Sequence, residues 1–361
     1  ADQTRMLRLL QGDVGSGKTV VAFLAMLDVI ECGHQAALMA PTEILAQQHF
    51  QTIEPLAAAL GLRSELLTSR SKGKARGSLL HDLEAGAIHI MVGTHSVYQD
   101  DVRFRDLALT VVDEQHRFGV EQRLALRDKG RSDGQAPHQL VMTATPIPRS
   151  LAMVMYADME ISVIDEMPPG RRPVETVVLP NTRRDEVQDR IRQACARGRR
   201  AYWVCPLIDE SEILAVEAAN SRAESLQKAL PELRVSVLHG RSRPAEKDAV
   251  MEDFRAGRID LLVATTVIEV GVDVPEASLM VIENAERMGL AQLHQLRGRV
   301  GRGAEKSVCV LMYQAPLGNN ARERLSTMRR TNDGFAIARK DLELRGPVSY
   351  THLTLPTSDL V

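Results

Sequence analysis

The sequence predicts two α/β domains in tandem, each a mostly parallel sheet covered by helices on both faces. Short apolar runs alternate with helical stretches along the chain, a proline-rich segment at 168–173 interrupts them once, and a glycine-rich loop occurs only before that interruption. Strands separated by helices form βαβ units, whose sheets are parallel and buried on both faces. We therefore expect one domain at 1–167, a linker at 168–173 and a second domain at 174–347.

Each predicted strand is a short apolar run, and the runs divide equally between the two domains. In the first domain they cover residues 6–10, 36–40, 88–92, 108–113, 139–143 and 162–165. In the second they cover residues 174–179, 200–204, 235–238, 261–265, 279–283 and 308–313. Near-continuous apolar runs, rather than alternating ones, are typical of strands inside a parallel sheet.

Composition limits the class of protein. A chain of 361 residues is too long for one ordinary core, and 44% apolar with 25% charged residues is typical of a soluble globular protein. The four cysteines are scattered singly, which favours a reducing cytoplasm over a zinc site or disulfides. No apolar run is long enough to span a membrane. The net charge of −2 means that any nucleic-acid surface is local.

The glycine-rich loop fits the phosphate-binding pattern G-x-x-x-x-G-K-[ST]. It consists of Gly12, Asp13, Val14, Gly15, Ser16, Gly17, Lys18 and Thr19. A predicted strand precedes it and a predicted helix at 20–30 follows, the context in which backbone N–H groups surround a nucleotide's phosphates. Lys18 would contact the β- and γ-phosphates, and the Thr19 hydroxyl would bind Mg²⁺. The chain is thus expected to bind a nucleoside triphosphate.

Two carboxylates at the end of a predicted strand indicate hydrolysis. Asp113 is placed to hold Mg²⁺ through water, and Glu114 can orient and deprotonate the attacking water. An ordinary acidic turn is the alternative, but the phosphate-binding loop in the same domain makes it the weaker one. Residues 143–145, Thr-Ala-Thr, end another strand, and their hydroxyls could bond to these carboxylates and sense the γ-phosphate. A plain strand-to-helix turn is an equal alternative for this stretch.

Small and hydroxyl-bearing residues follow other predicted strands, where they suit sugar-phosphate contacts that position nucleic acid without reading bases. The residues expected to contact DNA are Pro41, Thr42, Gly93, Thr94, His239, Gly240, Arg241 and Thr265. Four basic residues at 70–76 could also follow a phosphate backbone, although a solvated basic loop is the simpler interpretation.

The densest basic stretch covers residues 295–302, Gln-Leu-Arg-Gly-Arg-Val-Gly-Arg. Its glycines disfavour a helix, and its arginines present planar forks of donors that suit phosphate oxygens. An arginine from the second domain could stabilise the charge that develops as the γ-phosphate leaves a nucleotide in the first. A basic patch for nucleic acid is the alternative.

These motifs, in this order across two α/β domains, resemble the motor of superfamily-two helicases. Residues 113–120 (Asp-Glu-Gln-His-Arg-Phe-Gly-Val) and 143–149 (Thr-Ala-Thr-Pro-Ile-Pro-Arg) closely resemble the RecG family of bacterial branched-DNA translocases. So do Asn-Asp-Gly-Phe at 332–335 and Lys-Asp-Leu-Glu-Leu-Arg-Gly-Pro at 340–347. The transcription-repair coupling factor is similar, but it has Asp-Glu-Glu-His where this chain has Gln115 in the third position.

The resemblance implies two RecA-like domains that close over ATP and Mg²⁺, with DNA duplex running across both. Lys18, Asp113, Glu114 and Arg302 carry over as hydrolysis residues, Arg299 as a second arginine contact and Gln295 as part of the same nucleotide-binding cluster. The implied task is ATP-driven movement on duplex DNA that remodels stalled forks and four-way junctions. We expect a cytoplasmic monomer with branched DNA as partner and no membrane association.

Three alternatives to this function stay open, and two departures from the family bear on it. The alternatives are a translocase like the transcription-repair coupling factor, a superfamily-two RNA helicase, and a module whose nucleic-acid affinity is switched by nucleotide. The family's N-terminal region with its wedge domain is not in this sequence, which begins Ala-Asp-Gln and is expected to be a fragment. Residues 348–361 align with nothing in the family and are expected to be a foreign tail.

Overall fold

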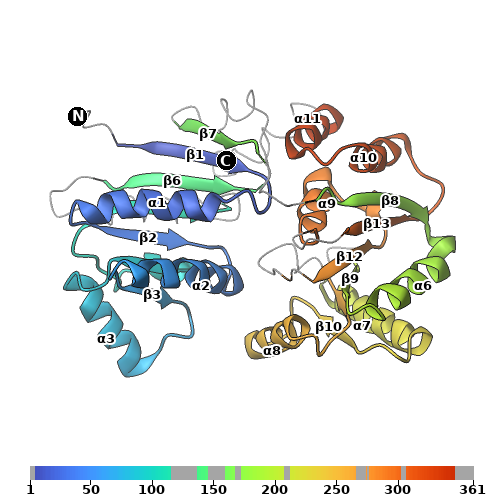
Figure 1. Ribbon diagram of the computed structural model, residues 1–361, viewed down its shortest axis with the longest axis horizontal. Coiled ribbons are helices and arrows are strands. Elements are labelled where there is room, and N and C mark those ends of the chain that lie inside the picture. The colour runs from blue at the N-terminus through green and yellow to red at the C-terminus, as the bar shows by residue number, and fades with distance from the viewer. Residues whose placement is uncertain are drawn as a thin grey trace, which may run out of the picture. The chain divides into compact units, whose positions relative to one another are not determined.

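The computed structural model describes residues 5–114, 136–144, 159–166, 172–206, 212–265, 274, 276–301 and 306–345. The described residues divide into two compact units, one up to residue 144 together with 159–166, and one from residue 172 onward (Figure 1). Most of the expected linker at 168–173 and all of the expected tail at 348–361 lie outside the described residues. The bounds of the linker and of the tail therefore stay predictions.

The first unit contains a seven-stranded sheet in the order β3-β4-β2-β5-β6-β1-β7, and every neighbouring pair is parallel. The strands are β1 (Leu7–Gly12), β2 (Gln35–Met39), β3 (Ser64–Leu67), β4 (Ile90–Gly93), β5 (Leu107–Asp113), β6 (His138–Thr143) and β7 (Glu160–Ile164). Since all strands run the same way, their carboxyl ends share one edge of the sheet. The polar residues predicted to bind ligands follow these ends.

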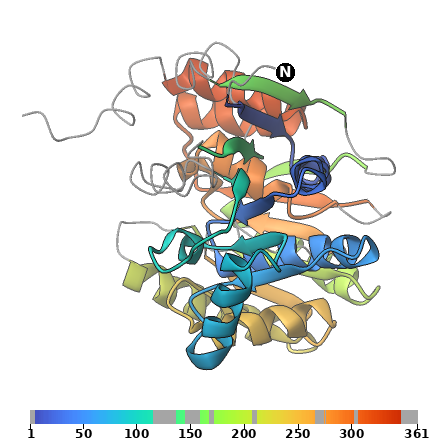
Figure 2. The same ribbon diagram turned by 90° about the vertical axis from the view of Figure 1, so that its left-hand side faces the viewer.

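Apolar side chains of β2 point alternately to the two faces of this sheet, and each face has its own cover. On one face Ala36 and Leu38 pack with α1 (Lys18–Glu31) and α2 (Glu43–Ala59). On the other, Ala37 and Met39 share a core with residues of α3 (Gly73–Glu84) and η1 (His95–Tyr98). Figure 2 shows α1 and α2, in the darker blues, on the same side of the sheet.

The second unit contains a six-stranded parallel sheet in the order β10-β11-β9-β12-β13-β8. Its strands are β8 (Glu175–Pro180), β9 (Arg200–Val204), β10 (Val235–Leu238), β11 (Leu261–Ala264), β12 (Ala277–Ile282) and β13 (Val308–Tyr313). Taken in chain order, these six strands repeat the arrangement of β1 to β6. The counterpart of the strand before the phosphate-binding loop is β8, which ends at Pro180 and has no glycine-rich loop after it.

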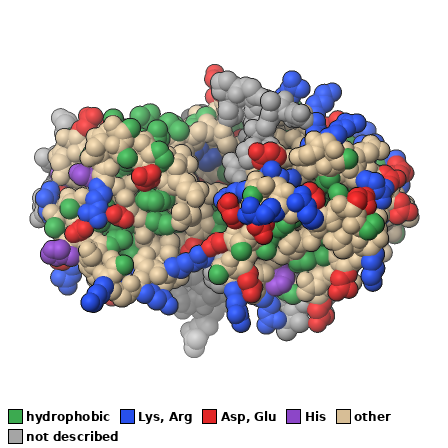
Figure 3. Space-filling view, turned by 60° about the horizontal axis from the view of Figure 1, so that its bottom comes forward, with side chains coloured by type: hydrophobic (Ala, Val, Ile, Leu, Met, Phe, Trp, Pro, Cys, Tyr) green, Lys and Arg blue, Asp and Glu red, His purple; other side chains and the backbone are tan. Residues whose placement is uncertain are grey.

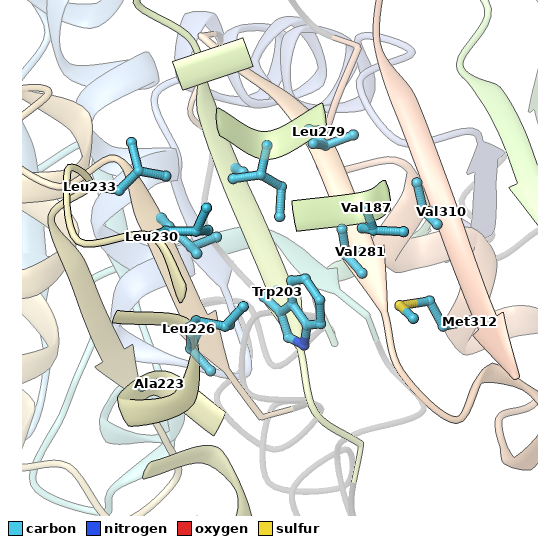
Figure 4. Packing of buried hydrophobic residues seen from close by; sticks show 14 of the residues in the cluster. Val187, Trp203, Ala223, Leu226, Leu230, Leu233, Leu279, Val281, Val310 and Met312 are labelled. Atoms are coloured by element: carbon cyan, nitrogen blue, oxygen red, sulfur yellow. The ribbon is translucent and has the colours of Figure 1, made fainter. Parts of the chain in front are cut away.

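Helices cover both faces of the second sheet as well. They are η3 (Asn181–Arg183), α6 (Arg184–Cys195), α7 (Glu212–Ala229), α8 (Pro244–Arg255), η5 (Ala285–Arg287), α9 (Leu290–Arg297), α10 (Asn319–Arg330) and α11 (Gly334–Arg345). Trp203 of β9 is fully buried and lies in a core with Val187 of α6 and Leu226 of α7 (Figure 4). Tyr202, the residue before Trp203 in β9, points to the opposite face of the sheet and packs on Phe254 of α8, with the two ring centroids 4.9 Å apart.

The predicted strands are confirmed, with ends that differ by a few residues at most, but the sequence missed β3. Ser64-Glu65-Leu66-Leu67 contains only two apolar residues and pairs on one side only, with β4. An edge strand needs no continuous apolar run, so the pattern that revealed the inner strands is absent. No helix in the described part of the chain is both long and apolar enough to cross a membrane.

An ion pair at the amino-terminal edge of the second sheet should make stability depend on pH. The Arg234 guanidinium donates to Asp260 through Nε at 2.8 Å and Nη2 at 2.7 Å. These bonds outweigh partial burial and hold the pKa of Asp260 below its ordinary value. A depressed pKa contributes stability above the carboxyl's unfolded-state value, and that contribution is lost as pH falls through the folded-state value.

We therefore expect Asp260→Asn to lower the free energy of unfolding by about 1 kcal/mol at pH 6 and by less at pH 3. Urea titrations of both proteins at the two pH values measure this. Asp253→Asn is the control, because its ion pair with Arg258 is more exposed, at 45% for Asp253 against 20% for Asp260. Equal losses at pH 6 and pH 3 would contradict the assignment.

Candidate functional site

The phosphate-binding loop joins the end of β1 to the start of α1, as the sequence predicts. Gly15 and Gly17 have φ angles of 77° and 94°, a left-handed conformation that favours glycine. A Cβ on Gly12 would lie 2.4 Å from Oγ of Ser16, so a larger residue there would force the Ser16 side chain to move. No side chain caps the N-terminus of α1. Its first N–H groups and dipole are thus suited to an anion.

Lys18 is buried and curls back over the loop that it follows. Its Nζ donates to the carbonyl oxygens of Gly12 and Asp13, both at 2.8 Å. The side chain is 9% exposed, so the positive charge lies inside the curve of the loop rather than in solvent. This is the location predicted for the residue that contacts the β- and γ-phosphates.

Asp113 ends β5, and only β6 separates β5 from β1 in the sheet. Burial by itself would raise the pKa of Asp113. The hydrogen bond from His49 and the positive charge of Lys18 act in the opposite direction, and the net pKa is lowered. Asp113 therefore stays a carboxylate in a buried site, the form in which it can hold a cation or its water shell.

Glu114 adopts a left-handed backbone conformation, with φ of 52°, which is uncommon for a residue with a side chain. Its N–H donates to the carbonyl of Met142 at 2.9 Å, and its Oε1 accepts from the N–H of Ala144 at 3.0 Å. Glu114 thus contacts the segment after β6 through the backbone N–H of Ala144, and the predicted hydroxyl contacts stay a prediction. Thr145 lies outside the described residues.

His49 of α2 is the residue of this site that the sequence analysis missed. Its Nε2 is 2.8 Å from Oδ2 of Asp113, and its Nδ1 is 3.4 Å from Oγ1 of Thr19. One imidazole thus contacts both residues predicted to hold Mg²⁺. No motif around a single histidine in a helix indicated this, because α2 and β5 are far apart in sequence.

The oxygen ligands present fit Mg²⁺ better than a metal with its own protein cage. The described residues contain no group of three or more His, Cys, Asp or Glu side chains that could hold a metal ion. Mg²⁺ is usually bound by one or two protein oxygens together with the substrate's phosphates and water. Thr19 and Asp113, joined through His49, supply such a pair.

The predicted DNA contacts of the first unit lie at the carboxyl ends of the neighbouring strands β2 and β4. Pro41 and Thr42 are half-buried, and the Thr42 hydroxyl accepts from the N–H of Leu45 as the cap of α2. Gly93 is buried, and a Cβ on it would lie 2.3 Å from the carbonyl oxygen of Leu67. Thr94 is 2% exposed. Gly93 and Thr94 therefore shape this edge from inside.

The predicted contacts of the second unit lie at the ends of β10 and β11, the counterparts of β3 and β4. Gly240 and Arg241 are exposed and His239 is half-buried. Thr265 is 3% exposed, and its N–H donates to the carbonyl of Leu238 at 3.2 Å. Each unit thus has a buried threonine after an inner strand of this edge, Thr94 after β4 and Thr265 after β11.

An Arg-Ser turn is repeated at this edge, once in each unit. In the first, Ser71 Oγ accepts from the N–H of Thr68 at 3.4 Å, and Ser71 N–H donates to the Thr68 carbonyl at 3.0 Å. Ser242 and His239 make the same two bonds, at 3.4 Å and 3.1 Å. Residues 68–72, Thr-Ser-Arg-Ser-Lys, thus correspond to residues 239–243, His-Gly-Arg-Ser-Arg.

The first of these turns corrects the interpretation of residues 70–76 as one basic loop. Helix α3 begins at Gly73, which places Lys74 and Arg76 on a helix. Arg76 pairs with Asp101 at 2.9 Å. Arg70 is 47% exposed at the turn and pairs with Glu43 at 2.9 Å.

The arginines of residues 295–302 do not share one role. Arg297, at the end of α9, is 2% exposed and donates to the carbonyls of Met328 and Thr331, each at 2.9 Å. It joins α9 to the end of α10, so it is a structural residue and not a phosphate contact. Gln295 is buried and Arg299 is half-buried, whereas Arg302 lies outside the described residues.

Comparison with known families agrees with this geometry. Residues 4–154 match the DEAD/DEAH box helicase family, and residues 184–304 match the helicase conserved C-terminal domain. Two parallel α/β domains, the first with a phosphate-binding loop and an adjoining Asp-Glu pair, define a helicase motor built of two tandem RecA-like domains. A yeast Dbp5 structure bound to RNA and ADP BeF3 has the same fold, with 18% identity, a TM-score of 0.68 and coverage of 96% of this chain and 90% of that one.

Within this class, the chain belongs to the RecG helicases. It is 60% identical over 343 residues to the ATP-dependent DNA helicase RecG of Escherichia coli, and 51% identical over 344 residues to that of Bacillus subtilis. Each match covers 95% of this chain and 50% of the relative. A solved structure of RecG bound to a three-way DNA junction is 44% identical, with a TM-score of 0.82, and the match covers 98% of this chain and 46% of that one. The chain thus spans about half the length of the curated relatives it matches.

Proposed function

We propose that this chain is the ATP-driven motor of a DNA helicase that moves on duplex DNA and remodels branched structures, namely stalled forks and four-way junctions, in recombination and repair. The observation that supports it most is the grouping at the phosphate-binding loop, where the charge of Lys18 lowers the pKa of Asp113 and Glu114 adjoins Asp113, in a chain closely similar to RecG. Glu114 beside Asp113 favours turnover over a nucleotide-controlled switch without hydrolysis.

The proposed mechanism assigns one task to each group. Mg²⁺ bound with ATP would neutralise charge on the β- and γ-phosphates and would be held by Thr19 and, through water, Asp113. Lys18 places a second positive charge at the same phosphates. Glu114 orients a water for attack on the γ-phosphate and takes its proton.

Two arginines of the second domain complete the proposed hydrolysis site. Arg302 and Arg299 supply positive charge that stabilises the γ-phosphate as it leaves, and the buried Gln295 belongs to the same cluster. The fixed fork of donors on arginine suits several phosphate oxygens at once. Because such charge acts on the transition state, we expect these residues to affect rate more than affinity for ATP.

The DNA contacts are proposed at the two equivalent sheet edges, one in each domain. In the first domain Pro41 and Thr42, and in the second His239, Gly240 and Arg241, are proposed to meet the DNA, while the buried Gly93, Thr94 and Thr265 would contribute through the backbone of each edge. The repeated turn adds Arg70 to this set. Basic and acidic side chains are interspersed on the face drawn in Figure 3, so a phosphate backbone would be held by local groups.

Substitution of the equivalent arginines tests this surface. Arg241→Ala and Arg70→Ala should each weaken duplex binding whatever the DNA sequence, and each should reduce the slope of log affinity against log salt concentration by about one. Fluorescence anisotropy with a labelled duplex at several salt concentrations measures both effects.

Arg63→Ala is the matched control for that experiment. Arg63 precedes β3, whereas Arg70 follows it, and the two side chains are 45% and 47% exposed. Its loss should change neither affinity nor slope. An Arg241 variant that binds with the wild-type slope would contradict the proposed edge.

One comparison of substrates tests the function as a whole. The ATPase rate should rise most with forked or junction DNA, less with linear duplex, and least with RNA. Strongest stimulation by RNA would favour an RNA helicase, and no stimulation by any nucleic acid would reject the motor. A preference for linear duplex over branches would favour a translocase like the transcription-repair coupling factor.

We propose a cytoplasmic monomer. Burial raises the pKa of the Cys205 and Cys309 thiols to about 12, which makes them inert, and the cysteines form no disulfide. Light scattering of the purified chain would measure its assembly state.

A further inference from the structure

His49 lies on the buried face of α2, where its neighbours are apolar. The other buried positions of the helix are Ala46, Ile53 and Ala57, spaced three or four residues apart as on one helix face. An apolar side chain would fill this position at lower cost, because a buried polar group must find hydrogen-bond partners. His49 is 8% exposed, and each ring nitrogen has a partner in the ATP site.

The two contacts have a defined direction. A carboxylate can only accept, so Nε2 of His49 donates to Oδ2 of Asp113 across 2.8 Å. In the neutral ring Nδ1 is then the acceptor, and the Thr19 hydroxyl donates to it across 3.4 Å. With its proton directed at His49, Oγ1 of Thr19 presents lone pairs to its other side. That is the orientation a hydroxyl needs to bind a cation.

We propose that His49 is a positioning residue that orients both protein ligands of the nucleotide's Mg²⁺. It turns the Thr19 hydroxyl so that oxygen lone pairs face the ion, and it holds one carboxylate oxygen of Asp113 so that the other is available to the ion's water. This inference rests on the proposed ATP site. Groups that orient metal ligands typically contribute 10–100-fold to metal affinity.

The first unit contains a matched histidine–aspartate pair away from the phosphate-binding loop. Nδ1 of His34 lies 2.8 Å from Oδ2 of Asp106, the same separation as between His49 and Asp113. His34 precedes β2 and Asp106 precedes β5, so this pair is at the amino-terminal edge of the sheet. Its loss removes a similar histidine–aspartate hydrogen bond from the same domain without touching a Mg²⁺ ligand.

The test measures binding of fluorescent methylanthraniloyl-ADP to the full chain, with Mg²⁺ and with EDTA. The ratio of the two affinities is the Mg²⁺ gain. His49→Leu should reduce this gain by about 10–100-fold and leave the affinity in EDTA within about twofold of wild type. His49→Gln, whose amide can donate to Asp113, should recover part of the gain. His34→Leu should keep all of it.

Unfolding curves separate this role from a purely structural one. A folded His49→Leu with the wild-type Mg²⁺ gain would overturn the proposal, and so would an equal loss of affinity with and without Mg²⁺. If the leucine variant does not fold, His49→Asn decides, since its amide is too short to reach Asp113 and an unchanged gain would again overturn it. A wild-type chain whose ADP affinity ignores Mg²⁺ would overturn this role together with the proposed Mg²⁺ ligands, whereas a folded wild-type chain that binds no ADP in either condition would reject the proposed ATP site itself.

Discussion

Replacing Lys18 with alanine is expected to abolish most ATP hydrolysis, with a loss of about two to three powers of ten in kcat. The reason is electrostatic: the Nζ is held inside the phosphate-binding loop by the carbonyls of Gly12 and Asp13, where solvent screens it little. Its charge would act on the β- and γ-phosphates while negative charge shifts between them. Steady-state phosphate release with saturating DNA and Mg-ATP measures the loss.

The design of this experiment must separate chemistry from folding. Lys18 also contributes positive charge that lowers the pKa of Asp113, so its removal alters two groups of the site. Lys18→Arg keeps the charge but changes its shape, and we expect it to restore binding of ATP more than turnover. Near-normal hydrolysis by a folded Lys18→Ala protein would mean that the loop is not the hydrolysis site.

The strands were predictable because the fold buries them on both faces. Residues 36–40 read as one apolar run, and all five residues of β2 are buried. The edge strand β3 lacks that signal, because Ser64 and Glu65 fill its first half. The edge strand β10 is buried to the same extent, but its sequence Val-Ser-Val-Leu is apolar enough to be predicted.

The candidate site was predictable where a motif places several groups along one segment, and unpredictable where the fold joins distant segments. The loop at 12–19 and the pair at 113–114 belong to the first kind. His49 belongs to the second, since 64 residues separate it from Asp113. Arg297 shows a further limit: it is one of several neighbouring arginines, and only the packing of α9 against α10 distinguishes the buried one.

Because Arg297 is held by packing, Arg302→Ala is the variant that tests whether the second domain supplies an arginine for hydrolysis. We expect this variant to lose about three to five powers of ten in the rate of hydrolysis, as for arginine fingers in general. ATP affinity should fall far less, because the charge that the arginine stabilises develops only in the transition state. Single-turnover hydrolysis and equilibrium binding of ATP, measured on the same protein, report the two quantities separately.

Two further variants test whether the effect depends on the guanidinium group of Arg302 rather than on positive charge alone. Arg302→Lys keeps a positive charge but loses the planar donors, so it should remain slow while binding DNA normally. Lys306→Ala removes a nearby exposed charge and should change nothing. If hydrolysis, ATP affinity and DNA affinity all fell together in Arg302→Ala, the residue would be a contact to the DNA backbone. The acceleration of phosphate transfer would then have to come from Arg299, the other arginine proposed for the hydrolysis site, whose side chain is half-buried.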